Sequence, residues 1–259
     1  MSEHRARKRF GQNFLQDRSV IDRIVTAINP QVGDALIEIG PGQGALTRPL
    51  LARCPQLQAI EIDRDLIAAL PRQLPGLRLI EADALTVDFA ALAAASAGLL
   101  RVVGNLPYNI SSPLLFHLLD TVAAIRDMHF MLQWEVVERM AAGPGSKAMG
   151  RLSVMLQARC RVEPLFKVPP GAFLPVPKVD SAVVRLLPLA QQPETAVLQA
   201  LSELTRLGFG QRRKTLHNTL RSHPLGSRLV DHGIDPGRRA ESLTLDEWLR
   251  LAGAAAIAD

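Results

Sequence analysis

The sequence has little cysteine and no pattern of metal-binding side chains. Its 259 residues include two cysteines, Cys54 and Cys160, which lie in apolar segments without a partner at a characteristic spacing. A disulfide framework is therefore not expected, and a reducing cytoplasm fits best. The six histidines are scattered along the chain, so we expect no bound metal.

Long apolar runs are also missing. The longest reads "FAALAAASAGLL", which is too short and too rich in alanine for a membrane span. The N-terminal stretch "MSEHRARKRF" is basic but precedes no apolar segment of the kind that a secretory signal needs. With 47% hydrophobic and 21% charged residues the composition is typical of a globular protein. We expect a cytoplasmic monomer that binds no membrane.

Acidic residues are scarce in two segments that are rich in lysine and arginine. The chain has a net charge of +5, and its positive charge is concentrated in residues 1–9 and 204–222. The first segment holds one acid, Glu3, and the second holds none. Concentrated positive charge suits nucleic acid, because each neutralised phosphate releases counterions. Either segment alone could be a solvated face, but together they favour a nucleic-acid partner.

Strand-like and helix-like patterns alternate through the first part of the chain. The apolar runs "ALIEI", "LQAIEI", "LRLIEA" and "LLRVVG" are each followed by a helical pattern. This alternation predicts a mostly parallel sheet with helices on both faces. From Gln191 onward the patterns are helical and include no strand, so we place a domain boundary near Leu189. The expected domains are residues 1–189 and a small all-helical domain, residues 190–259.

A glycine-rich stretch, "EIGPGQGALT" (38–47), follows the first of these runs and opens a helix. Glycine lets the backbone approach a ligand and adopt positive φ. Gly40, Gly42 and Ala45 satisfy the dinucleotide pattern G-x-G-x-x-A, and Glu61 at the end of the next run could accept from a ribose diol. These features indicate a nucleoside-containing cofactor and leave NAD open.

Two later features narrow the choice of cofactor. Asp83 ends the third run, where its carboxylate could accept from the exocyclic amine of adenine; a helix N-cap is the alternative. After the fourth run comes the tetrapeptide "NLPY", Asn105 to Tyr108.

The tetrapeptide suits an adenine substrate. The adenine N6 amine is a poor nucleophile because its lone pair is delocalised into the ring. The Asn105 side-chain oxygen and the Leu106 carbonyl could accept its two N–H groups, since Pro107 bends the chain out of any ladder. Tyr108 could stack on the base. The matching electrophile is a methyl group on a sulfonium, which needs no metal.

The order of these motifs resembles that of the ribosomal RNA adenine dimethyltransferases. The matching stretches are "RFGQNFL", "EIGPGQGALT", "EID", "EADAL", "GNLPYNISSPLLF" and "FLPVPKVDSAVVRL". Within that family, "FGQRRKTLHNTL" is similar to the small-subunit branch rather than the macrolide-resistance branch. Gly210 departs from the family pattern, in which a polar residue is commoner. The resemblance implies a class I methyltransferase fold, S-adenosylmethionine as methyl donor, and dimethylation of two adjacent adenosines in a hairpin loop near the 3′ end of 16S ribosomal RNA.

The resemblance also implies roles for individual residues. The expected cofactor residues are Asn13, Leu15, Gly40, Glu61, Asp83 and Asn105. The expected catalytic residues are Asn105, Leu106, Pro107, Tyr108 and Phe173, the last closing over the target base opposite Tyr108. The two basic segments, rather than the resemblance, supply the expected RNA-binding residues: Arg7, Lys8, Arg9, Arg212, Arg213 and Lys214.

Three other functions compete with this one. The nearest is a 23S ribosomal RNA adenine methyltransferase of the resistance type. A ribosome-assembly factor could keep the fold without turnover, although the intact "NLPY" and glycine turn favour an enzyme. An NAD oxidoreductase fits least, because the sequence shows no site for handling a hydride.

Overall fold

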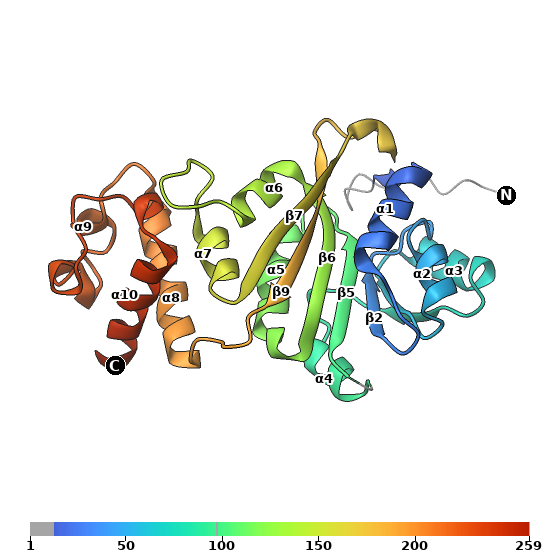
Figure 1. The fold of residues 1–259 in the computed structure, drawn as a ribbon, viewed down its shortest axis with the longest axis horizontal. Helices are drawn as coiled ribbons and strands as arrows, with labels where there is room; N and C mark the ends of the chain where they lie inside the picture. Colours follow the sequence, from blue (N-terminus) through green and yellow to red (C-terminus); the bar gives the residue numbers. More distant parts are fainter. Residues whose placement is uncertain (1–12, 97, 259) are drawn as a thin grey trace. The chain divides into compact units, whose positions relative to one another are not determined.

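The computed structural model describes residues 13–258 apart from residue 97, and its main element is one large sheet (Figure 1). The seven strands lie in the order β4-β3-β2-β5-β6-β9-β7. Their bounds are β2 (Ala35–Ile39), β3 (Gln58–Glu61), β4 (Arg78–Glu81), β5 (Leu100–Asn105), β6 (Ile125–Gln133), β7 (Cys160–Val168) and β9 (Ser181–Pro188). The five strands from β4 to β6 pair in parallel, and β9 pairs with β6 in the antiparallel sense. The predicted mostly parallel α/β sheet is confirmed.

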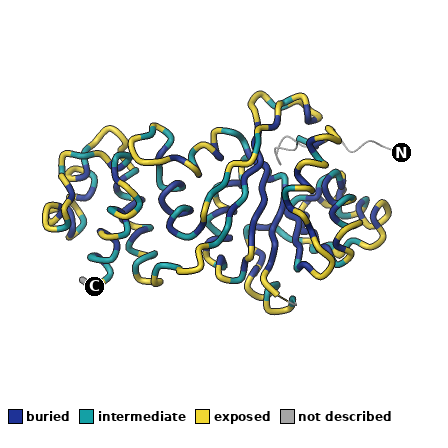
Figure 2. The backbone as a smooth tube through the Cα atoms, viewed as in Figure 1, coloured by how far each residue is buried: buried dark blue, intermediate teal, exposed yellow. Residues whose placement is uncertain are grey.

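Helices precede, connect and follow the parallel strands, and α2 to α5 alternate with them as the pattern predicts. They are α1 (Arg18–Ile28), α2 (Thr47–Arg53), α3 (Arg64–Gln73), α4 (Phe89–Ala94), α5 (Ser111–Asp120) and α6 (Trp134–Met140), with the short 3-10 helix η2 (Val122–Ala124) before β6. Aspartates begin several of them: Asp17, Asp63 and Asp88 each accept backbone N–H bonds at the start of α1, α3 and α4. The central strands are the most deeply buried part of this layer (Figure 2).

A second, two-stranded sheet lies outside the main one. Its strands are β1 (Phe14–Leu15) and β8 (Phe173–Leu174), which pair in the antiparallel sense. The 3-10 helix η3 (Pro170–Ala172) directly precedes β8. Phe14 faces Leu174 across the pair, and Leu15 faces Phe173. The pairing joins the first described residues to the chain between β7 and β9.

The chain divides into two compact units. One holds the residues up to Val137 together with Glu163–Pro188, and the other holds Glu138–Val162 together with the residues from Leu189 onward. The second unit, called here the helical unit, contains α7 (Arg151–Gln157), α8 (Thr195–Gly208), α9 (Leu216–Thr219) and α10 (Leu245–Ala258), with the 3-10 turns η4 (Phe209–Gln211), η5 (Pro224–Ser227), η6 (Val230–His232) and η7 (Ala240–Ser242). Segment 138–162 belongs to it because α7 packs against α8 and α10.

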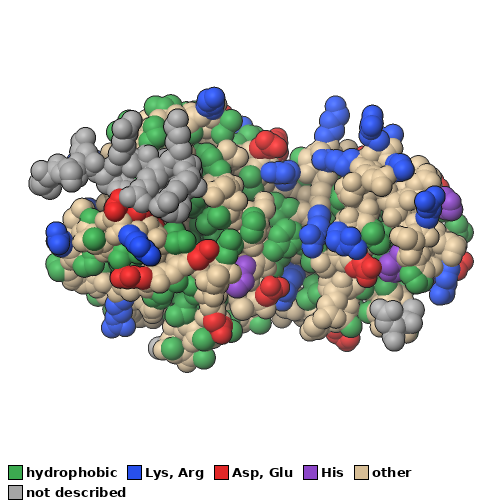
Figure 3. All heavy atoms as spheres, turned by 180° about the vertical axis from the view of Figure 1, so that it is seen from behind, with side chains coloured by type: hydrophobic (Ala, Val, Ile, Leu, Met, Phe, Trp, Pro, Cys, Tyr) green, Lys and Arg blue, Asp and Glu red, His purple; other side chains and the backbone are tan. Residues whose placement is uncertain are grey.

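The helical unit is built around Trp248, which is fully buried. A Cβ atom on Gly208 would lie 2.7 Å from Cη2 of Trp248, so glycine lets α8 and α10 approach closely at this point. Lysine and arginine side chains gather on the surface of this unit (Figure 3). Among the described residues, no helix has both the length and the apolar content to cross a bilayer.

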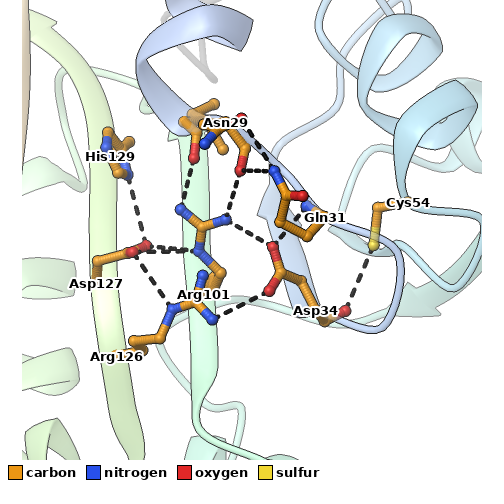
Figure 4. Close-up of polar contacts among 9 residues, drawn as sticks. Asn29, Gln31, Asp34, Cys54, Arg101, Arg126, Asp127 and His129 are labelled. Carbon is orange, nitrogen blue, oxygen red and sulfur yellow. Dashed lines mark hydrogen bonds and ion pairs between the residues drawn. The ribbon is translucent and has the colours of Figure 1, made fainter.

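A buried polar network lies at the amino ends of the parallel strands (Figure 4). Arg101 in β5 donates from Nε to both carboxylate oxygens of Asp127, at 3.0 and 3.1 Å, and from Nη1 to Asp34 at 2.6 Å. It also donates to the carbonyls of Ile28 and Asn29, the last residue of α1 and its C-cap. One guanidinium therefore joins β2, β5, β6 and α1.

Candidate active site

A cavity of about 300 Å³ opens at the carboxyl ends of the parallel strands. Ligands of open α/β sheets bind at this edge, because loops that follow adjacent strands separate there. The cavity walls come from the chain around β1 and from the turns after β2, β3, β4 and β5. They include the predicted residues Asn13, Leu15, Gly40, Glu61, Asp83, Asn105, Leu106, Pro107 and Tyr108. The structure thus brings together nearly all of the residues expected to bind cofactor and adenine.

The glycine turn after β2 supplies one wall. Gly40, Gly42 and Gly44 have φ values of 67°, 56° and 83°. Residues other than glycine rarely adopt this region of backbone conformation. The amide of Gly40 donates to the carbonyl of Ile60 in β3 at 2.9 Å. A Cβ on Gly42 would lie 3.2 Å from the ring of Phe14, so the turn and β1 meet with no space between them.

Two carboxylates follow β3 and β4. Oε1 of Glu61 accepts from the amides of Ile62 and Asp63, both at 2.9 Å, which fixes the side chain in the cavity wall. Burial raises the pKa of Glu61 above its ordinary value, against these hydrogen bonds. Oδ1 of Asp83 accepts from the amide of Leu85 at 3.0 Å, which holds a turn. The N-cap of α4 is Asp88, so the helix-cap alternative for Asp83 is wrong.

The tetrapeptide after β5 supplies the facing wall. Nδ2 of Asn105 donates to the carbonyl of Asn13 at 3.1 Å, so the nitrogen end of this amide is used by the protein. The amide of Leu106 donates to the carbonyl of Met131 in β6 at 3.1 Å. The hydroxyl of Tyr108 lies 3.3 Å from Oγ of Ser181 at the start of β9, which positions the half-buried ring.

Comparisons with known proteins identify the family. A family model described as "Ribosomal RNA adenine dimethylase" matches residues 3–256. The chain belongs to this ribosomal RNA adenine dimethylase family. A curated relative from Chromohalobacter salexigens, named "Ribosomal RNA small subunit methyltransferase A", is 57% identical over 96% of this chain and 91% of its own. One of the same name from Erwinia tasmaniensis is 55% identical over 96% and 93%.

Solved structures of dimethylases and related enzymes share the fold. The crystal structure of the 23S rRNA methyltransferase ErmE has a TM-score of 0.71 and 31% identity, covering 93% of this chain and 98% of its own. A dimethyladenosine transferase from Plasmodium falciparum has a TM-score of 0.76 and 26% identity, covering 92% and 95%. The predicted methyltransferase class is therefore confirmed, and the chain is an enzyme of the dimethylase family.

Among the predicted catalytic and cofactor residues, Phe173 is the one that does not line the cavity. It is 3% exposed and packs in the hydrophobic core with Leu15, its partner in the β1–β8 pair. The next residue, Leu174, is 63% exposed. A contact between Phe173 and a target base stays a prediction for this dimethylase.

The predicted RNA-binding residues fall in two places. Arg7, Lys8 and Arg9 lie outside the described residues. Arg213 and Lys214 are exposed on the helical unit, beside Arg212. The Arg212 guanidinium also donates to the carbonyls of Lys147 and Met149, at 2.6 and 3.0 Å, so it holds a loop of its own unit.

Two residues with structural consequences were not assigned a role from the sequence. Glu38 is buried in the cavity wall, and among the described residues its Oε2 has no hydrogen-bond partner. Burial, with a smaller effect from the charge of Glu61, raises the pKa of Glu38 to about 7. Gly104 lies directly before Asn105, and a Cβ there would be 2.5 Å from the carbonyl oxygen of Ile39. The position of Glu38 near the end of an apolar strand could have been recognised in the sequence as a signal of a functional acid. The close approach of Gly104 to the carbonyl of Ile39 leaves no such signal. Among the described residues, no cluster of side chains suits a metal ion.

Proposed function

We propose that the protein uses S-adenosylmethionine to dimethylate N6 of two adjacent adenosines in a hairpin loop near the 3′ end of 16S ribosomal RNA, during assembly of the small subunit. The observation that carries this proposal is the orientation of Asn105. Because its nitrogen donates to Asn13, its oxygen is the end that can accept from an amine in the cavity.

The cavity offers partners for each part of the proposed cofactor. Four predicted cofactor residues line this cavity. Glu61 would accept from the ribose hydroxyls and Asp83 from the adenine amine, and Asn13 and Leu15 would border the methionine part. Glu38 adds a buried carboxyl with an unpartnered oxygen, which suits a ligand that carries positive charge. When bound, this cofactor supplies a methyl group on a positively charged sulfur, and loss of that methyl group leaves the sulfur as a neutral thioether.

The chain's own residues prepare the adenine amine for attack. The Asn105 oxygen and the Leu106 carbonyl accept its two N–H groups, and the lone pair then localises on nitrogen and turns toward the methyl carbon. Tyr108, held at Ser181, stacks on the base and fixes its plane. In this transfer a new N–C bond would replace the methyl–sulfur bond of the cofactor, and the proton lost from the nitrogen would pass to solvent. Before the second transfer the amine keeps one hydrogen, so one acceptor is then idle.

Sequence identity favours the small ribosomal subunit over the large one. Relatives at 55–57% identity carry the small-subunit name, whereas the large-subunit enzyme ErmE is 31% identical. The test is incubation of unmethylated small and large subunits with methyl-labelled cofactor, followed by mapping of the label. We expect dimethyladenosine at two adjacent positions of the small-subunit RNA. Label in the large subunit would support the resistance-type function, and label in neither would support the non-catalytic assembly factor.

We further propose that the protein is a cytoplasmic monomer whose basic segments contact RNA phosphates. Arg213→Glu with Lys214→Glu should lower the slope of log affinity against log salt by about 1.5, because two phosphate contacts are lost. Arg72→Glu with Arg78→Glu, which changes two exposed arginines of the other unit, is the matched control. Equal slopes for the two double variants would show that Arg213 and Lys214 are ordinary surface charges. Arg212 is left intact because it holds its own loop.

A further inference from the structure

The segment between β8 and β9 exposes an unusual amount of apolar surface. Residues 174–180, called here the rim segment, read "LPVPKVD". Leu174, Val176 and Val179 are 63%, 62% and 45% exposed. Within the described residues, these are three of the ten exposed large hydrophobic side chains, and they lie within seven positions. Figure 2 draws much of the chain between β7 and β9 as exposed. Such clustering indicates a contact surface, because exposed apolar side chains are usually scattered singly.

Both ends of the rim segment are fixed beside the proposed active site. Leu174 pairs with Phe14, whose ring lines the cavity. Side chains of directly paired residues lie on the same face of an antiparallel ladder, so Leu174 extends the Phe14 wall outward. At the other end, Asp180 is followed by Ser181, whose hydroxyl contacts that of Tyr108. The segment therefore borders the cavity and continues its surface.

The charges around the rim segment fit a polyanion rather than another apolar surface. Lys178 is exposed within the segment, and Lys167 is exposed on β7. The ammonium of Lys167 lies 3.9 Å from the centre of the Trp134 ring. The amide of Trp134 donates to the carbonyl of Asp180 at 2.9 Å, which places this pair next to the end of the segment. Two lysines accompany the segment's single acid.

We infer that the rim segment contacts the unpaired nucleotides that flank the target adenosine. Their bases and riboses pack on Leu174, Val176 and Val179, and Lys178 and Lys167 neutralise neighbouring phosphates. Single-stranded RNA suits such a surface, because splayed bases present apolar faces beside charged phosphates. The inference rests on the proposed function for the nature of the substrate. It gives the rim segment a role in holding RNA that is separate from the transfer step.

The test compares two double variants with similar exposed apolar area. Leu174→Ser with Val176→Ser changes the rim segment. Val32→Ser with Leu99→Ser is the matched control, because Val32 and Leu99 are 82% and 52% exposed and precede β2 and β5 at the opposite edge of the sheet. All four positions are exposed, so neither variant removes core packing.

Affinity for an unmethylated hairpin of the substrate RNA, measured without cofactor, is the main readout. We expect the rim variant to bind about five- to twenty-fold more weakly, with the control unchanged. In steady state the rim variant should raise KM for RNA by a similar factor, with kcat and cofactor affinity within about two-fold of wild type. Equal RNA affinity in both variants would overturn the inference, and so would a matching loss of cofactor affinity, which would make the segment a support of the cavity.

Tryptophan fluorescence gives a second readout. The chain has two tryptophans, and Trp248 is fully buried in the helical unit whereas Trp134 is half-buried beside Asp180. RNA should quench the Trp134 emission, and Trp134→Phe should remove the quenching. An RNA-insensitive signal would contradict the inference. A wild-type dimer that the rim variant dissociates, at unchanged RNA affinity, would instead identify a second copy as the occupant.

The two proposals fail in different ways. Absence of methyl transfer by the wild-type protein to small subunits overturns the proposed function. The rim inference is decided by the ratio of RNA affinities between variant and wild type, which needs no turnover.

Discussion

Buried acids lie at both ends of the parallel strands, Asp34 and Asp127 at the amino ends and Glu38 at the carboxyl end of β2, and their surroundings differ. At the amino ends, Arg101 pairs with Asp34 and Asp127 and also caps α1. Burial opposes ionisation of Asp127, yet the imidazole of His129, 3.6 Å away, and the hydrogen bonds from Arg101 lower its pKa to about 2. At the carboxyl ends, Glu38 has no cationic partner within the part of the chain that the structure describes, and burial raises its pKa to about 7. Burial of an acid thus gives opposite pKa shifts at the two ends, depending on whether the protein supplies the counter-charge.

The comparison separates structure from function within one sheet. A buried charge that is fully paired contributes to one fixed arrangement, and removing its partner is costly. A buried acid left without a partner costs stability and is suited to a ligand that brings the missing charge. We therefore assign the amino ends to the framework and the carboxyl ends to the proposed chemistry.

The largest expected effect breaks the paired end. Arg101→Met should lower the free energy of unfolding by about 3–5 kcal/mol, because two carboxylates are then buried without their partner. Urea unfolding at pH 7 measures it. Arg126→Met is the control, since Arg126 meets the same two acids but its side chain is 49% exposed. It should cost less than about 1 kcal/mol. Similar losses of unfolding free energy in the two variants would show that the buried ion pairs of Arg101 stabilise the protein no more than the exposed ones of Arg126.

The next largest effect is expected at the carboxyl ends of the strands, where Asn105 lies. Asn105→Ala should lower kcat for methyl transfer by about a hundred-fold, the usual result of removing a positioned polar group from a transition state. RNA affinity and unfolding free energy should change little, because the side chain makes one hydrogen bond to the protein that the structure records, to Asn13. Asn109→Ala, an exposed cavity-wall change, is the control. Lost RNA binding with normal turnover of bound RNA would assign Asn105 to binding instead.

The smallest expected effect is a difference between Glu38 and Asp127 in how each makes the stability of the protein depend on pH. The pKa of Glu38 is about 7 in the folded protein against an ordinary 4.5, so the folded state binds more protons between these values. Stability contributed by Glu38 therefore falls as pH rises from about 4.5 to 7. Asp127 acts oppositely: its pKa is lowered from 3.8 to about 2, so its contribution is present above pH 3.8 and is lost as pH falls toward 2.

Glu38→Gln should remove the first of these dependences. The variant should be about 2 kcal/mol more stable than wild type at pH 8 and nearly equal to it at pH 4, while cofactor affinity at pH 8 falls about ten-fold. Glu81→Gln, an exposed acid at the end of β4, is the control. Parallel stability curves for wild type and Glu38→Gln would mean that Glu38 is not desolvated in solution.

The sequence predicted the parallel sheet and most of the cavity because both depend on local patterns. Apolar runs ending in Glu38, Glu61 and Asn105 mark where strands stop, and parallel strands place such ends at one edge. The glycine turn was readable because positive φ restricts residue choice. These are short-range signals that neighbouring residues carry.

The features that were not predicted depend on distant parts of the chain. Arg101 reads as one charge in an apolar strand, and its partners lie 67 and 26 positions away. The burial of Phe173 follows from its pairing with Leu15, which no local pattern specifies. Segment 138–162 joins the helical unit because α7 packs on α8 and α10, although β7 then leads the chain back into the sheet.

The absence of a side chain at Gly104 has a consequence for the geometry of transfer. Its backbone touches the carbonyl of Ile39, so the strand that ends in the glycine turn and the strand that ends in Asn105 meet without a spacer. One added carbon would force these strands apart and, in the reaction proposed above, would lengthen the distance between the methyl donor and the adenine nitrogen. Gly104 would then limit how far apart the two reactants can bind, although it touches neither of them.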